Sequence, residues 1–210
     1  MFYGVLPSPP SLPFAVYVWE VLSLGTTPSR RDAALAALKK IPALTSDAIA
    51  RVPQAKLAEA IARAGPMKDE RIRALRAGAD LFRRQPSLLD DLAGPAARAL
   101  RAVRRIPHLG RASSLRVLLF ASGIPVLPLD GHALRVARRL GYAAGPDDRP
   151  PARTLSLVRQ ALTRESGREV ATLRAMSQYL THHGLSTCTE ISPHCTVCPL
   201  AHDCEWIRRQ

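Results

Sequence analysis

The chain has 210 residues, 47% of them hydrophobic, which is enough to bury one good core or two small ones. Its 30 Lys and Arg outnumber its 17 Asp and Glu, and the resulting net charge of +13 is typical of a protein that meets a polyanion, with nucleic acid the first candidate. A membrane span is not expected, because the longest uncharged apolar run, 117–129, is too short and contains Gly123, Pro125 and Pro128.

Helical signals dominate the chain and strand signals are nearly absent, which predicts an all-α fold. A mostly apolar, buried helix is expected over 13–24. Ser29 is the expected N-cap of a second helix that ends at Leu38, since a serine hydroxyl can accept a hydrogen bond from the first turn. Thr45 or Ser46 is expected to cap the third helix.

The segment 69–82 is amphipathic, and Ile72, Leu75 and Leu81 are spaced to face the interior. The stretch 143–151 is polar and rich in proline, so we expect it to be a linker. Further helices are expected over 55–63, 94–105, 111–120, 130–141, 152–163 and 170–183.

A short turn of sequence Ile-Pro-His-Leu-Gly separates the helices expected over 94–105 and 111–120. Such a hairpin leaves backbone N–H groups unpaired at the start of its second helix, and these can hold a DNA phosphate without reading sequence. His108 stands where glycine would accept a positive φ more easily, so we expect a distorted turn, although the ring could itself donate to a phosphate.

Arginines surround this hairpin. Residues 92–146 contain nine of them and a single acidic residue, Asp130. A charge run is usually just a solvated face, but its overlap with a phosphate-binding hairpin favours DNA as the partner. The nine are Arg98, Arg101, Arg104, Arg105, Arg111, Arg116, Arg135, Arg138 and Arg139.

All four cysteines stand near the C-terminal end, in a C-x6-C-x2-C-x5-C pattern that is typical of metal ligands. Four thiolates suit zinc or an iron–sulfur cluster, and the single C-x2-C pair is not the double pair of a zinc ribbon. His194 and His202 keep a mixed zinc site open, although loop surface is the simpler interpretation for both. The four are Cys188, Cys195, Cys198 and Cys204.

Asp130 precedes an expected helix in the string Asp-Gly-His-Ala-Leu-Arg-Val. An isolated Asp at this position is most simply an N-cap. However, the helix terminus and the basic neighbours favour its ionised form, and a fixed carboxylate is what cleavage of a glycosidic bond needs. Such a group can stabilise an oxocarbenium-like sugar or orient an attacking water.

The order of hairpin, aspartate and four-cysteine loop resembles the endonuclease III-like DNA glycosylases of the helix-hairpin-helix superfamily. The resemblance is specific over about 94–206 and looser over 13–90. It implies a two-lobed, all-α fold, with a helical barrel domain over 14–128 and an iron–sulfur cluster domain over 1–13 and 129–210. It also implies that Asp130 is catalytic and that the four cysteines hold a [4Fe-4S] cluster, with zinc as the alternative.

The chain departs from the family pattern at three places. Ala112 stands where bifunctional members have a catalytic lysine, and no lysine follows Lys68, so the resemblance predicts no efficient lyase activity. Gly25 stands where the family has a glutamine that fills the gap left by a flipped base. Met67 or Pro66, from the opposing loop, could fill that gap instead. The N-terminal helix of the family is nearly missing.

We therefore expect a monomeric DNA glycosylase of base-excision repair that acts on damaged or mismatched bases in double-stranded DNA without efficient AP-lyase action. Residues 1–10 have no basic segment of a secretory signal, which favours a cytoplasmic, nucleoid-associated location. The alternatives are a catalytically degenerate iron–sulfur DNA-binding protein and a zinc-stabilised helical protein. The expected DNA contacts are Gly25, Pro66, Met67, His108, Leu109, Gly110 and Arg111.

Overall fold

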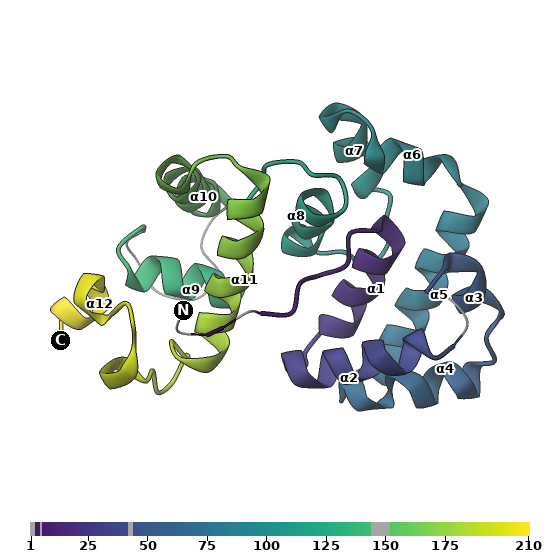
Figure 1. Ribbon diagram of the computed structural model, residues 1–210, viewed down its shortest axis with the longest axis horizontal. Coiled ribbons are helices and arrows are strands. Elements are labelled where there is room, and N and C mark those ends of the chain that lie inside the picture. The colour runs from purple at the N-terminus through teal and green to yellow at the C-terminus, as the bar shows by residue number, and fades with distance from the viewer. Residues whose placement is uncertain (1–2, 5, 42–43, 144–151) are drawn as a thin grey trace. The chain divides into compact units, whose positions relative to one another are not determined.

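The computed structural model describes residues 3–4, 6–41, 44–143 and 152–210 (Figure 1). Within these ranges every regular element is a helix, so the all-α prediction is confirmed. None of the helices described is long and apolar enough to cross a membrane. The expected linker over 143–151 lies, apart from Ala143, outside the described residues.

The chain forms two compact units. One is Pro9–Ile124, called the hairpin unit below, and the other, the cysteine unit, combines Met1–Ser8 with Pro125–Gln210. The hairpin unit contains α1 (Pro13–Ser23), α2 (Pro28–Lys39), α3 (Ser46–Arg51), α4 (Gln54–Ile61), η1 (Ala62–Ala64), α5 (Lys68–Arg84), α6 (Ser87–Ala93), α7 (Ala96–Val103) and α8 (Arg111–Phe120).

Helix α1 forms the centre of the hairpin unit. Its residues from Phe14 to Leu22 are all buried, and it contacts α2, α5 and α8. A Cβ at Gly78 would overlap the ring of Tyr17, which shows that α1 lies very close to α5. The Tyr17 hydroxyl donates to the carbonyl of Ala74 at 2.5 Å. Burial is the main cause that raises the Tyr17 pKa, so the ring stays neutral and donating.

A buried ion pair joins α1 to α8. Arg116 Nη1 donates to both carboxylate oxygens of Glu20, at 3.0 and 2.9 Å, and both side chains are buried. The guanidinium of Arg31 lies 4.1 Å from the ring centroid of Trp19 on the same side of the core. Removing one member of such a pair typically costs about 3–5 kcal/mol, because the other charge is left buried.

Several local predictions are confirmed and two are wrong. Thr45 caps α3, since its hydroxyl accepts from the N–H of Ala48 at 3.2 Å. The N-cap of α2 is Thr27, not Ser29, because Pro28 already occupies the first helical position, which proline favours. On α5 the expected inward residue Leu81 is only half-buried.

The buried position at the end of α5 belongs instead to Phe82, which packs edge-on against Phe14 with ring centroids 5.3 Å apart. Helix α6 was not predicted, and its presence means that α7 begins at Ala96 rather than at residue 94. The turn between α6 and α7 contains Gly94 and Pro95, which end one helix and begin the next.

The cysteine unit contains α9 (Gly131–Arg139), α10 (Ala152–Ser166), α11 (Val170–Ser186), η2 (Cys195–Val197), η3 (Ala201–Asp203) and α12 (Glu205–Arg208). A Cβ at Gly184 would lie 2.6 Å from the carbonyl oxygen of His132, which shows that α9 and α11 pack closely. The N-terminal residues bind the outer side of α11: Gln178 donates to Pro7 and Tyr179 to Gly4.

Candidate functional site

The hairpin lies between α7 and α8, as predicted. His108 adopts φ +60°, the left-handed conformation, and its side chain is exposed. The positive φ therefore occurs at His108, the position at which glycine was expected to adopt it more easily. Gly110 is the N-cap of α8 and supplies no side-chain cap, and a Cβ there would meet nothing within 4 Å. Arg111 follows it and is exposed, whereas Leu109 is half-buried.

The nine arginines of 92–146 divide into two groups. Five are exposed on the hairpin and its helices: Arg98, Arg101, Arg104, Arg105 and Arg111. The other four, Arg116, Arg135, Arg138 and Arg139, are buried, so they do not contribute to an exposed basic surface. Three of the buried arginines lie on a single face of α9, at positions 135, 138 and 139.

Asp130 is both an N-cap and a held carboxylate. Its Oδ1 accepts from the N–H of Ala133 at 2.9 Å, which closes the first turn of α9. Its Oδ2 accepts from the hydroxyl of Thr181, on α11, at 2.8 Å. The residue is half-buried, so solvent still reaches it. Asp130 belongs to the cysteine unit, whereas the hairpin belongs to the other unit.

The loops that carry Gly25 and Met67 are neighbours. Met67 precedes α5 in the left-handed conformation, with φ +67°, and its side chain is 44% exposed. Its sulfur would lie 3.2 Å from a Cβ at Gly25. The Met67 side chain therefore lies beside Gly25, which has no side chain of its own. Pro66, next in the same loop, is exposed.

Arg71 ties these two loops together. It is 0% exposed, and its guanidinium donates to the carbonyls of Leu24, Gly65 and Pro66. Burial lowers the Arg71 pKa, and the nearby carboxylate of Glu70 partly opposes that shift. A buried arginine that is shared by two loops preorganises both.

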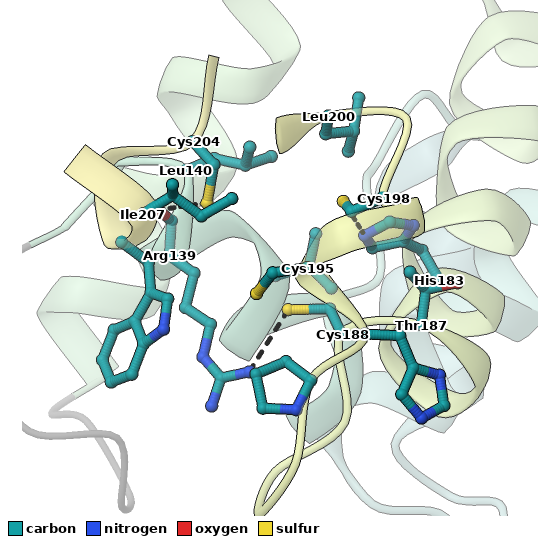
Figure 2. Close-up of a pocket in the computed structure, with 14 residues that line it drawn as sticks. Arg139, Leu140, His183, Thr187, Cys188, Cys195, Cys198, Leu200, Cys204 and Ile207 are labelled. Carbon is teal, nitrogen blue, oxygen red and sulfur yellow. Dashed lines mark hydrogen bonds between the residues drawn. The ribbon is translucent and has the colours of Figure 1, made fainter. Parts of the chain in front are cut away.

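The four cysteines line one pocket, which is partly open to solvent (Figure 2). The walls come from the end of α9, the end of α11, the turn η2, the residues on either side of η3, and α12. Trp206 also lines the pocket, and the guanidinium of Arg139 lies 4.7 Å from its ring centroid. Trp206 therefore packs against the cysteine loop.

Two side chains approach the sulfurs from outside the cysteine set. Arg139 Nη1 donates to Cys188 Sγ at 3.4 Å, and its guanidinium also donates to the carbonyls of Thr189 and Glu190. His183 Nε2 lies 3.6 Å from Cys198 Sγ (Figure 2). Its Nδ1 lies 2.5 Å from the hydroxyl of Tyr3.

Burial is the main cause that raises the pKa of the Cys198 thiol. A backbone hydrogen bond from Leu200 opposes the shift, and the other three cysteines add to it. Four thiols that disfavour one another's charge are a set that a bound cation would stabilise. The donors from Arg139 and His183 would stabilise the same thiolates.

The spacing of the sulfurs bears on the kind of metal centre. Tetrahedral zinc, with Zn–S bonds of about 2.3 Å, needs its sulfurs within about 4 Å of one another. Among the described residues, no three His, Cys, Asp or Glu side chains are gathered closely enough to hold one metal ion. The four thiols are the donor set of either a zinc site or an iron–sulfur cluster, in which each thiolate binds a different iron atom. His194 and His202 are both exposed, and His202 contacts Asp203 at 3.1 Å.

Known proteins resemble this chain in sequence and in fold. No protein-family model matches the chain. It is 32% identical to endonuclease III of Treponema pallidum over 107 residues, 49% of this chain and 44% of that protein. It is 28% identical to endonuclease III of Bacillus subtilis over 122 residues, 56% of this chain and 50% of that protein. The chain spans about half the length of the curated relatives it matches.

Solved structures match over nearly the whole chain. A non-covalent endonuclease III–DNA complex superposes with a TM-score of 0.70 at 23% identity, covering 98% of this chain and 86% of that one. A thermostable thymine-DNA glycosylase superposes with a TM-score of 0.70 at 18% identity, covering 95% and 86%. At these identities the likeness establishes the fold.

The fold is therefore the one that endonuclease III and the thymine-DNA glycosylase share. The predicted resemblance to the endonuclease III-like proteins is confirmed by the curated relatives and by this fold.

Proposed function

We propose that this protein is a DNA glycosylase of base-excision repair, which removes a damaged or mismatched base from duplex DNA. The observation that carries the proposal is Asp130, held as a carboxylate at the start of α9 within this fold. The hairpin supplies the binding surface, with the start of α8 and the exposed arginines around it directed at DNA phosphates, although Arg98 and Arg105 also contact Asp91.

The role proposed for Asp130 is electrostatic. Cleavage of an N-glycosidic bond develops positive charge on the sugar, and a fixed carboxylate stabilises that charge or orients a water for attack. Hydrogen bonds from the N–H of Ala133 and from the hydroxyl of Thr181 hold the carboxylate at the start of α9.

We propose that strand cleavage is weak or absent. A lyase step requires an amine that forms a Schiff base with the sugar. The position that corresponds to the lysine of the family is Ala112, a half-buried residue in the first turn of α8. Every lysine in the chain precedes residue 69.

The four cysteines are proposed to hold a [4Fe-4S] cluster, with zinc as the alternative centre. When bound, such a cluster would anchor the segment 188–204, and ligation by all four thiolates would leave no open metal position for a substrate. Arg139 and His183 would donate to the ligand sulfurs of Cys188 and Cys198.

The test is a single-turnover assay on duplexes that carry uracil, an oxidised pyrimidine, a G·T mismatch or an abasic site. Products are measured with and without hot alkali. A monofunctional glycosylase gives strand breaks only after alkali, because base loss leaves an intact but alkali-labile abasic site. Strand breaks without alkali would contradict the inference drawn from Ala112.

The control variant is Asp130→Asn. Asparagine is as good an N-cap as aspartate, so folding and DNA binding should be retained. Base release should fall by at least about 10³-fold, because the charge at the reacting sugar is lost. An Asp130→Asn variant with wild-type base release would remove Asp130 from the chemistry.

A second candidate function is DNA binding without catalysis. Three replacements favour it: Ala112 for the family lysine, Gly25 for the family glutamine and His108 for the first hairpin glycine. This reading predicts tight binding to damaged or abasic duplexes by cluster-loaded protein, with no alkali-labile product from either the wild type or the Asp130→Asn variant.

A further inference from the structure

The carboxylate of Asp130 receives hydrogen bonds from two different helices. An N-cap needs only one of them, the bond from the N–H of Ala133 to Oδ1, which spans three residues. The second bond, from Thr181 Oγ1 to Oδ2, crosses to α11 and joins residues 51 apart in sequence. Capping gives no reason for this second bond.

The second bond restricts the rotation of the carboxylate. A capping aspartate that is held through one oxygen can still turn its other oxygen about the Cβ–Cγ bond, which has a broad torsional minimum. With Oδ1 held by α9 and Oδ2 held by α11, both oxygens are fixed in direction. Orientation of this kind is what a catalytic carboxylate needs and what a cap does not.

Thr181 stands on a helix that is firmly attached to α9. Arg135, on α9, donates to the carbonyl of Gly184 at 2.6 Å and to the carbonyl of Cys188 at 3.0 Å. The close approach of Gly184 to His132 leaves no room for the two helices to slide. The hydroxyl of Thr181 is therefore held at a defined place relative to the start of α9.

We propose that Thr181 is a positioning residue, which orients the Asp130 carboxylate toward the reacting sugar or water. The inference rests on the proposed glycosylase function. A displacement of about 1 Å at a reacting group can cost on the order of 100-fold in rate. Loss of the Thr181 hydroxyl is expected to slow base release by about 10–100-fold, without a matching loss of DNA affinity.

The experiment compares Thr181→Val, which keeps the shape and loses the donor, with Thr181→Ser, which keeps the donor. The control on the same helix is Thr172→Val, because Thr172 lies in the first turn of α11 and donates to the nearby Glu169 at 3.0 Å. Single-turnover base release, the Kd for an abasic duplex and the melting temperature are measured for each protein.

The expected result is slow base release by Thr181→Val with unchanged Kd, near-complete recovery in Thr181→Ser and wild-type behaviour of Thr172→Val. Wild-type base release by Thr181→Val would overturn the proposal. Equal losses in the Val and Ser variants, with lowered melting temperatures, would also overturn it, because the role would then be packing. If Thr181→Val does not fold, Thr181→Ala takes its place.

Failure of the proposed function is recognised separately. If the wild-type protein releases no base from any of the four duplexes, the glycosylase proposal fails and the positioning role of Thr181 fails with it. If the wild type is active and only the variant comparison is flat, the glycosylase proposal stands and the role of Thr181 is refuted.

Discussion

Arg71 provides the sharpest test of how the loop of Gly25 and the loop of Met67 are held. Its guanidinium is fully buried and donates to the carbonyls of Leu24, Gly65 and Pro66, which belong to the loops before α2 and before α5. The perturbation is Arg71→Met, which keeps an unbranched apolar stem, is shorter than arginine and removes every donor.

The expected loss follows from these contacts. A buried carbonyl left without its donor costs about 1–3 kcal/mol, and three carbonyls set an upper limit of about 9 kcal/mol. Two terms reduce that limit: the methionine avoids the desolvation cost of a buried charge, and loop carbonyls can turn partly toward water. We expect the free energy of unfolding to fall by about 2–4 kcal/mol.

Urea unfolding followed by circular dichroism measures this change. Arg71→Lys should lose an intermediate amount, about 1–2 kcal/mol, because an ammonium is a point donor that cannot span three carbonyls. The matched control is Arg73→Met on the same helix. Arg73 is exposed and forms only a 3.3 Å surface ion pair with Glu70, so its loss should stay within about 0.5 kcal/mol.

A change of less than about 0.5 kcal/mol in Arg71→Met would refute the reasoning, since the loops would then be held by other contacts. A loss of unfolding free energy in Arg71→Met that is no larger than in Arg73→Met would also refute the reasoning. Hydrogen exchange gives an independent readout: in Arg71→Met, protection should fall at residues 24–26 and 65–67 before it falls elsewhere in the hairpin unit.

Three further predictions concern single positions. His108→Gly should raise the free energy of unfolding by about 0.5–1 kcal/mol, because φ +60° is costly for histidine and free for glycine; unchanged or lower stability in urea would contradict this. Gly78→Ala should lower it by more than about 2 kcal/mol, because the new methyl overlaps the ring of Tyr17, and a melting temperature like that of the wild type would show that α1 and α5 can separate. Cys198→Ala should abolish iron and sulfide content and the absorption near 400 nm, whereas wild-type protein with stoichiometric zinc and no iron would reject the cluster.

Several features of this protein can be predicted from its sequence because they depend only on residues close to one another in the chain. The spacing of the four cysteines brings them to one pocket, since few residues separate them and short loops limit how far they can diverge. Asp130 as the N-cap of α9 depends only on the next three residues. The left-handed turn at His108 depends on the hairpin itself.

Tertiary structure alone decided which charged and polar groups are held, and by what. Arg71 donates a hydrogen bond to the carbonyl of a residue 47 positions away, and Thr181 donates one to an aspartate 51 positions away. In the sequence, the arginines of α9 look the same as those of the hairpin. In the structure, Arg135 and Arg139 of α9 are buried and donate to carbonyls and a cysteine sulfur, while those of the hairpin are exposed. The physical reason is that the burial of a charge depends on partners that distant segments supply, and no local pattern of residues reports them.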